Sequence, residues 1–165
     1  MTFLSNQTVR KYIWYTEKTF VLESVPTYFT NKEKEIVKSP MYYFLDLGLR
    51  NFLRGPFHDT NDMGLRFQNL VYRLLERKYR HTTTSIHYWR SKGGAEVDFV
   101  LNFGVEVLPV EVKASAFSKP KLTRSYRSFL ERYQPNEGWV VHSGSYMEER
   151  VGKTILKFKP WYDFI

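Results

Sequence analysis

Apolar side chains recur with a helical period in three long stretches of the chain. They predict helices over residues 4–20, 64–79 and 118–134, because side chains three and four positions apart share one face of a helix. Ser5 stands at the position of an N-cap for the first of these helices. A fourth, shorter helix is expected to end at Gly55, since glycine often terminates helices.

Shorter apolar runs predict strands. A β-ribbon with a charged tip is expected over residues 20–46, and a strand with a turn over residues 82–94. The runs AEVDFVL and VEVLPVEVK flank the turn residues NFG, which is typical of a β-hairpin over residues 95–113. A buried strand is predicted at 137–144, and a closing strand with a tail at 153–164.

The order of these elements predicts the fold class. From residue 64 onward a helix, three strands, a helix and a strand follow one another, which indicates an α/β (α+β) domain with a mixed sheet flanked by helices. The N-terminal helix and ribbon have the order of the last helix and wing of a winged helix-turn-helix domain. We therefore expect a partial winged helix at residues 1–50 and a second domain at residues 51–165. The two preceding helices of a winged helix are not visible, which favours a fragment of something longer.

The predicted hairpin carries ionisable side chains between apolar ones. Its first strand should alternate, with Glu96 and Asp98 on one face. Its apolar residues should share the opposite face: Val97, Phe99 and Leu101. On the second strand Glu111 and Lys113 are expected to share a face. Because ionised groups are costly to bury unless they are paired or bind a metal, this pattern predicts ion pairing or a metal site.

Composition narrows the classes of partner. The net charge of +8 and the pI near 9.6 favour a polyanion, most often nucleic acid, and DNA is the expected partner. The chain has no cysteine, which excludes disulfides, thiol nucleophiles and cysteine-based zinc sites. No apolar stretch approaches the roughly 18 residues that cross a bilayer, and the N-terminus has no signal-peptide layout. We expect a cytoplasmic protein without a membrane partner.

The charged residues of the hairpin suit metal-assisted phosphodiester hydrolysis. Asp98 and Glu111 are candidate ligands of Mg²⁺ (or Mn²⁺), since two carboxylates hold such an ion while it keeps water for chemistry. A bound metal lowers the pKa of an attacking water. Lys113 is expected to orient that water or to stabilise the charge that develops. The competing interpretation is a structural ion-pair cluster of the same three side chains.

Three stretches resemble a known family: SPMYYFLDLGLRNFL, WRSKGGAEVDFV and LPVEVKAS. They are similar to the C-terminal region of unknown function that follows the P-loop motor in many bacterial and archaeal AAA-type ATPases. The resemblance runs from about Leu4 to Phe164 and is most specific in the D…ExK hairpin. It implies a winged helix joined to a restriction-endonuclease-like domain of PD-(D/E)xK type, and an upstream ATPase domain as partner. It also implies that Asp98 and Glu111 are metal ligands and that Lys113 is the catalytic lysine.

One position departs from the family pattern. The helix usually reads G-x-x-F-E-N, and its glutamate completes the metal site, whereas this chain reads GLRFQN with Gln68. A glutamine brings an oxygen but no charge, so weaker Mg²⁺ binding is expected. Glu96 is a candidate replacement, whereas Glu76 should lie on the far side of the helix. The strand register decides whether Glu96 or Asp98 lies beside Glu111, and the sequence leaves both open.

Basic and polar side chains form three sets of candidate nucleic-acid contacts. They are Gln7, Arg10 and Lys11 on the first helix, Arg90 and Lys92 before the hairpin, and Lys121, Arg124 and Arg127 on the outer side of the helix at 118–134. The competing interpretation is that these are ordinary solvated faces.

Two functions follow from these patterns. One is a Mg²⁺-dependent nuclease, which the retained Asp98, Glu111 and Lys113 favour. The other is a catalytically silent nuclease fold that serves as a DNA-binding or protein-interaction module of an ATPase, which Gln68 favours. Nucleotide binding by the VGKT stretch is not expected, because Met147 stands where a phosphate-binding loop needs its first glycine.

Overall fold

In the computed structural model, the N-terminal part of the chain forms a helix and a two-stranded ribbon. The structure describes residues 4–29, 39–54, 62–116, 119 and 121–165. Helix α1 (Asn6–Lys18) begins after Ser5, whose hydroxyl accepts a hydrogen bond from the Thr8 backbone N–H at 3.2 Å, as the capping pattern predicts. Strands β1 (Leu22–Val25) and β2 (Met41–Phe44) pair antiparallel and form the predicted ribbon. The charged tip of the ribbon and Gly55 lie outside the described residues.

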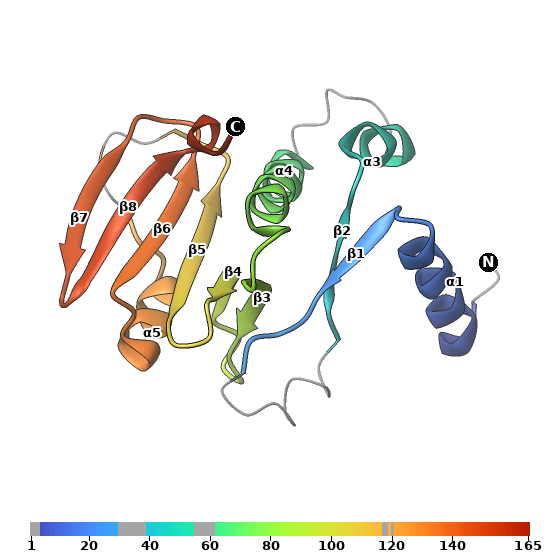
Figure 1. Cartoon of the computed structure of the whole chain (residues 1–165), viewed down its shortest axis with the longest axis horizontal. Coiled ribbons are helices and arrows are strands. Elements are labelled where there is room, and N and C mark those ends of the chain that lie inside the picture. The colour runs from blue at the N-terminus through green and yellow to red at the C-terminus, as the bar shows by residue number, and fades with distance from the viewer. Residues whose placement is uncertain (1–3, 30–38, 55–61, 117–118, 120) are drawn as a thin grey trace.

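Two further helices lead from the ribbon to the sheet (Figure 1). They are α3 (Leu47–Arg54) and α4 (Met63–Tyr79). A buried ion pair ties them together, with Arg50 Nη1 2.9 Å from Asp62 Oδ2. Asp62 directly precedes α4, so this pair fixes the start of the helix that carries Gln68.

Within the described residues, six strands form one mixed sheet in the order β3-β4-β5-β6-β8-β7 (Figure 1). Their bounds are β3 (Ser85–Arg90), β4 (Glu96–Asn102), β5 (Val107–Lys113), β6 (Glu137–His142), β7 (Met147–Val151) and β8 (Thr154–Pro160). The β5–β6 and β6–β8 pairs are parallel and the others antiparallel. Helix α5 (Arg124–Tyr133) makes the crossover that the parallel β5–β6 pair requires. The predicted mixed sheet flanked by helices is confirmed.

Strand β7 is an element that the sequence did not predict. Its residues, MEERV, are mostly exposed at the edge of the sheet, where β8 is its partner among the described strands. A charged edge strand lacks the apolar alternation by which strands are recognised, and its charges protect the edge from pairing with another chain.

Two apolar clusters cover the sheet. One joins α4, the ribbon and the C-terminal 3₁₀ helix η2 (Trp161–Phe164) to sheet residues that include Phe99 and Val110. The other joins α5 to Val97 and Val100 of β4. The charged hairpin residues therefore lie in a sheet that is packed on both sides.

A β-bulge in β4 changes the predicted alternation of side chains. The β3 residue Tyr88 lies opposite two β4 residues, Asp98 and Phe99. As a result, Val97 packs in the α5 cluster, whereas Phe99 packs on the α4 side, toward which Asp98 also points. Phe99 and Leu101 share a face as predicted, but Val97 lies on the other face and Asp98 points to the same side as Phe99, because the extra residue reverses the alternation at this point.

Two predicted boundaries also shift. Residues 103–106 form the hairpin turn, in which the Phe103 N–H donates to the Glu106 carbonyl at 3.0 Å, so the turn is longer than NFG. Helix α5 begins at Arg124 with Thr123 as its N-cap. Lys121 therefore lies before the helix and not on its outer side. None of the helices in the described ranges is long and apolar enough to cross a bilayer.

Candidate functional site

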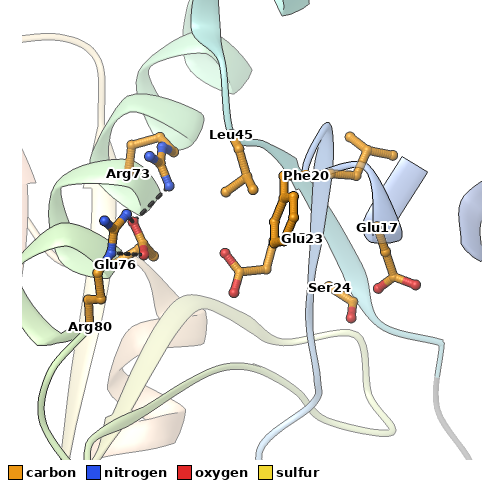
Figure 2. A pocket seen from close by; sticks show the side chains of 9 residues that line it. Glu17, Phe20, Glu23, Ser24, Leu45, Arg73, Glu76 and Arg80 are labelled. Atoms are coloured by element: carbon orange, nitrogen blue, oxygen red, sulfur yellow. Dashed lines mark hydrogen bonds and ion pairs between the residues drawn. The ribbon is translucent and has the colours of Figure 1, made fainter. Parts of the chain in front are cut away.

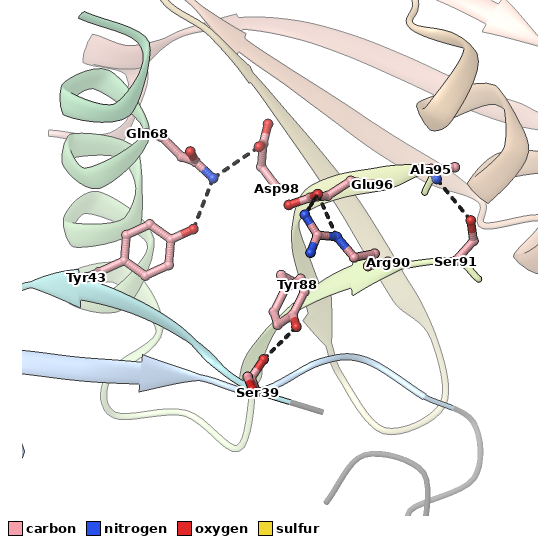
Figure 3. Close-up of polar contacts among 9 residues, drawn as sticks. All are labelled: Ser39, Tyr43, Gln68, Tyr88, Arg90, Ser91, Ala95, Glu96 and Asp98. Atoms are coloured by element: carbon pink, nitrogen blue, oxygen red, sulfur yellow. Dashed lines mark hydrogen bonds and ion pairs between the residues drawn. The ribbon is translucent and has the colours of Figure 1, made fainter. Parts of the chain in front are cut away.

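Asp98 is held by donors from two neighbouring elements, and Figure 3 shows the one from α4, Gln68. Gln68 of α4 donates from Nε2 to Asp98 Oδ1 at 3.0 Å, and the Val112 backbone N–H of β5 donates to Asp98 Oδ2 at 2.7 Å. The regular β4–β5 pairing ends at Phe99, so the Asp98 side chain binds β5 where the backbone ladder stops. At the bulge, the Asp98 carboxylate is thus held between α4 and β5.

The electrostatic surroundings of Asp98 oppose its ionisation. Burial, followed by the carboxylate of Glu111, raises the pKa of Asp98 to about 7, while the Val112 N–H and the Lys113 ammonium act in the opposite direction. Two carboxylates close together in a partly buried place repel each other, and this repulsion raises the pKa of the one that is harder to ionise. A carboxyl group that titrates near neutrality is a recognised mark of functional sites.

Glu111 is the more deeply buried of the two carboxylates, with 6% of the residue exposed. Its Oε1 lies 2.8 Å from Lys113 Nζ and accepts a hydrogen bond from the Thr123 hydroxyl at 3.2 Å. Thr123 is the N-cap of α5, so its hydroxyl also accepts from the Tyr126 backbone N–H. The start of α5 is thereby anchored to the charged end of β5.

The register settles which acidic residue of β4 lies beside Glu111. The last regular pair joins Phe99 to the residue that precedes Glu111, so Asp98 is the next residue along β4. Glu96 instead pairs with Arg90 of β3, whose Nη2 lies 2.7 Å from Glu96 Oε2. Glu96 is therefore a neighbour of the site whose charge is already balanced, and Asp98 takes the place beside Glu111.

Tyr43 enters the site from the ribbon, and no sequence pattern had indicated it (Figure 3). Its hydroxyl accepts a hydrogen bond from Gln68 Nε2 at 3.0 Å. Burial, together with the charges of Asp98 and Glu96, raises the pKa of Tyr43, so its phenol stays neutral. Gln68 thus presents its nitrogen to both neighbours and acts as a hydrogen-bond donor toward Asp98.

The donor set fits a hard divalent ion. Mg²⁺ is usually held in proteins by one or two carboxylates, with water and substrate phosphate supplying the remaining oxygens. Asp98 and Glu111 offer two carboxylates, and their mutual repulsion is what a cation between them would relieve. Within the described ranges, no group of three or more His, Asp or Glu side chains is placed to hold an ion. A site built from these two carboxylates would therefore depend on water and substrate for its other ligands.

Glu76 lies in a separate pocket of about 660 Å³ between β1 and α4 (Figure 2). Its carboxylate is paired with Arg73, at 2.7 Å, and with Arg80, at 2.8 Å, and these pairs lower the pKa of Glu76. Asp98 is not among the residues that line this pocket. Glu76 therefore lies away from Asp98, on the far side of α4, where the helical spacing predicted it.

The predicted nucleic-acid contacts fall into separate places. All of them are exposed: Gln7, Arg10, Lys11, Arg90, Lys92, Lys121, Arg124 and Arg127. The last three flank Thr123, which binds Glu111, and Arg90 pairs with Glu96 near Asp98. The α1 residues lie on the other side of the ribbon from the sheet (Figure 1). The structure thus places Arg124 next to a residue that binds Glu111 and Arg90 beside Glu96, and it leaves the α1 set apart.

The VGKT stretch forms a hairpin turn between β7 and β8. Gly152 takes a positive φ of 60° in that turn, and strand β8 begins at Thr154. A phosphate-binding loop joins a strand to a helix, so this geometry agrees with the expectation that the stretch binds no nucleotide.

Two family models match the chain. One, described as Domain of unknown function (DUF4143), matches residues 63–162, and the other, Domain of unknown function (DUF8612), matches residues 2–60. The first range contains Gln68, Asp98, Glu111 and Lys113, whereas the second contains Tyr43. A comparison with curated proteins found no match.

Proposed function

Since the chain belongs to the family described as Domain of unknown function (DUF4143), which covers residues 63–162, we propose an activity from the chemistry of its site: divalent-metal-dependent hydrolysis of DNA phosphodiesters. The observation that carries the proposal is the meeting of Asp98 with the Glu111–Lys113 pair at the end of the β4–β5 ladder. The sheet, its flanking helices and the D…ExK spacing agree with a nuclease fold of PD-(D/E)xK type. The net charge of +8 supports a polyanionic substrate.

Each residue has a role that follows from its surroundings. Asp98 and Glu111 would hold Mg²⁺ or Mn²⁺, which supplies an activated water and polarises the phosphate. Lys113 brings a positive charge next to Glu111, where it can orient the water or stabilise negative charge in the transition state. Gln68 and the Val112 N–H hold the Asp98 carboxylate in place.

The resemblance of the sequence to regions behind P-loop motors supports an association with an AAA-type ATPase. In that setting the site would act on DNA that the motor delivers, and the basic residues at the start of α5 would contact the DNA backbone. The α1 helix and ribbon would correspond to the last part of a winged helix that joins the two.

A second candidate function is favoured by Gln68. This residue brings no negative charge and donates to Asp98, which leaves two carboxylates for a metal. A silent nuclease fold that binds DNA or another protein for the ATPase would keep the same ion pairs without cutting. Metal binding and cleavage distinguish the two functions.

The deciding experiment is cleavage of supercoiled plasmid and single-stranded DNA in Mg²⁺ and in Mn²⁺. We expect metal-dependent cutting by the wild type and a loss of at least about 100-fold in Lys113→Ala, because one charge-stabilising group is removed. Lys153→Ala, which changes an exposed lysine in the β7–β8 turn, is the matched control and should cut normally.

Thermal unfolding with and without the ion separates the alternatives. We expect either ion to raise the melting temperature of the wild type and Asp98→Ala to abolish the rise. A rise without cleavage would favour the silent module. Identical melting curves with and without both ions would remove the metal site from consideration.

A further inference from the structure

Two adjacent residues of α4 attach the ribbon to the sheet domain. Asn69 binds the Phe44 backbone at both of its polar groups, accepting from the N–H at 3.0 Å and donating to the carbonyl at 2.8 Å. Gln68 donates to the Tyr43 hydroxyl at 3.0 Å. The ribbon strand β2 is thus aligned with α4 at the position where α4 contacts Asp98.

The Tyr43 side chain is held firmly where it meets Gln68. It is 5% exposed, and its ring stacks on Tyr72 with centroids 4.5 Å apart and contacts Phe99 at 5.4 Å. Because both rings belong to the cluster between α4 and the sheet, the hydroxyl is fixed in position by packing and not by the ribbon alone.

The Gln68 amide has two protons on Nε2, and each has an acceptor. One acceptor is Tyr43 Oη and the other is Asp98 Oδ1, both at 3.0 Å. A glutamine side chain that is not fixed can present its oxygen in place of its nitrogen, and an oxygen facing the Asp98 carboxylate would be repelled. The Tyr43 hydroxyl takes the second Nε2 proton of Gln68, so it restrains the amide group that binds the Asp98 carboxylate.

We propose that Tyr43 is a positioning residue for Asp98, acting through Gln68, so that the docking of the N-terminal ribbon sets the geometry of the carboxylate site. The inference rests on the proposed function as far as metal binding is concerned, but the hydrogen-bonded chain from Tyr43 to Asp98 exists without metal. A residue of the region matched by one family model thereby completes a site in the region matched by the other. Any partner that lifts the ribbon from α4 would alter the hold on Asp98.

The test compares two tyrosines that each lose one hydroxyl. Tyr43→Phe removes the acceptor for Gln68 and keeps the ring. Tyr88→Phe is the matched control, because Tyr88 is also buried and its hydroxyl also connects the sheet to the chain near the ribbon, by donating to the Ser39 carbonyl at 2.8 Å (Figure 3). A loss of packing or of ribbon attachment in general would affect both variants alike.

The first readout is the exchange of the Gln68 side-chain amide protons with water, followed by NMR in metal-free protein. We expect the protons to be protected in the wild type and in Tyr88→Phe, and to exchange at least about tenfold faster in Tyr43→Phe. Equal protection in all three proteins would overturn the proposal whether or not the protein binds metal.

The second readout is the affinity for Mn²⁺, measured by calorimetry. We expect Tyr43→Phe to weaken it by about 10-fold, the lower end of the effect of residues that orient metal ligands, and Tyr88→Phe to leave it unchanged. In a Gln68→Ala background, Tyr43→Phe should have no further effect, because its action passes through Gln68. An equal loss in the presence and absence of Gln68 would contradict that route. Absence of Mn²⁺ binding by the wild type would overturn the proposed function, and the exchange measurement would still decide the role of Tyr43.

Discussion

The pKa of Asp98 differs between the folded and the unfolded chain. Burial and Glu111 raise its pKa to about 7 in the folded protein, whereas an aspartate in an unfolded chain titrates near about 3.9. Between about pH 4 and about pH 7 the folded state keeps a proton that the unfolded state has released. The contribution of Asp98 to stability therefore falls as the pH rises through this window, by up to about 1.4 kcal/mol per pH unit.

Asp98→Asn should remove the fall in stability that Asp98 causes as the pH rises. An asparagine keeps the shape of the side chain and can accept from the Val112 N–H, and its amide can donate to Gln68 once the Gln68 amide turns. We expect the variant to gain stability over the wild type at pH 8 in metal-free buffer, and to gain less at pH 5. Urea unfolding at the two pH values measures the difference. The same gain at both pH values would contradict a raised pKa of Asp98.

Gln68→Glu tests the proposed metal site, because it would introduce the glutamate that the resemblance implies at this position. A third carboxylate near Asp98 and Glu111 adds a charged oxygen ligand, so we expect Mn²⁺ to bind about tenfold more tightly. The Tyr43 hydroxyl can donate to the new carboxylate, which preserves the contact with the ribbon. Calorimetric titration gives the affinity, and Gln68→Ala is the control for loss of the amide. Unchanged affinity in Gln68→Glu would mean that the ion does not reach α4.

At the scale of elements, the Asn69 side chain bonds the backbone of β2 to α4. Asn69 is 3% exposed and takes the place of a strand partner for Phe44, because it offers one acceptor and one donor to the same backbone residue. Without it, two backbone groups in a partly buried place would lose their partners. Such losses cost about 1–3 kcal/mol for each group left unsatisfied.

Asn69→Ala is therefore expected to lower the free energy of unfolding by about 2–4 kcal/mol, counting both Phe44 groups with part of the loss recovered by water. Asn136→Ala is the control, since Asn136 is exposed and its amide contacts Glu106 at 3.3 Å on the surface. That control should change stability by less than about 0.5 kcal/mol. Equal effects of the two substitutions in chemical unfolding would show that the ribbon is not held through Asn69.

The elements differ in how well the sequence predicted them. Helix α4 and helix α5 were predicted because their apolar spacing is repeated over several turns, and Ser5 identified the start of α1. Strand β7 was missed because an exposed edge strand has no apolar alternation. On the buried side of α4, Tyr72 stacks on Tyr43 of the ribbon and Asn69 bonds the Phe44 backbone, and neither contact has a signal in the apolar spacing.

At the scale of the whole molecule, part of the excess positive charge lies at the start of α5. Lys121, Arg124 and Arg127 are exposed beside Thr123, which touches Glu111. If DNA reaches the carboxylates, its backbone would pass this end of α5. Each phosphate contact on duplex DNA contributes about 0.9 to the negative slope of log affinity against log salt concentration.

Replacing these three residues with alanine should reduce the magnitude of the salt slope by up to about 2.7, as three phosphate contacts are lost. Fluorescence anisotropy with a labelled duplex at several salt concentrations measures the slope. The control replaces Arg150 and Lys153, which are exposed on β7 and its turn, at the opposite end of α5 from Arg124. A larger change in the control than in the α5 variant would place the DNA surface elsewhere.

The sequence by itself determined the local features of this protein. Helical spacing, strand composition and the D…ExK pattern each depend on residues close together in the chain, so they are legible without knowledge of the fold. For the same reason the sequence could single out Asp98, Glu111 and Lys113, whose side chains interact in the structure, whereas Glu76 lines a separate pocket.

Only the tertiary structure decided how those features meet. The bulge at Asp98 is a feature of the pairing of β4 with β3, and the register that brings Asp98 and not Glu96 beside Glu111 is set by the pairing of β4 with β5. Tyr43 reaches Gln68 across 25 residues of sequence, through the packing of the ribbon on α4. Contacts of this kind join residues that are far apart in the sequence, and they form only when the ribbon packs on α4. The pattern of residues within one stretch of the chain therefore cannot predict them.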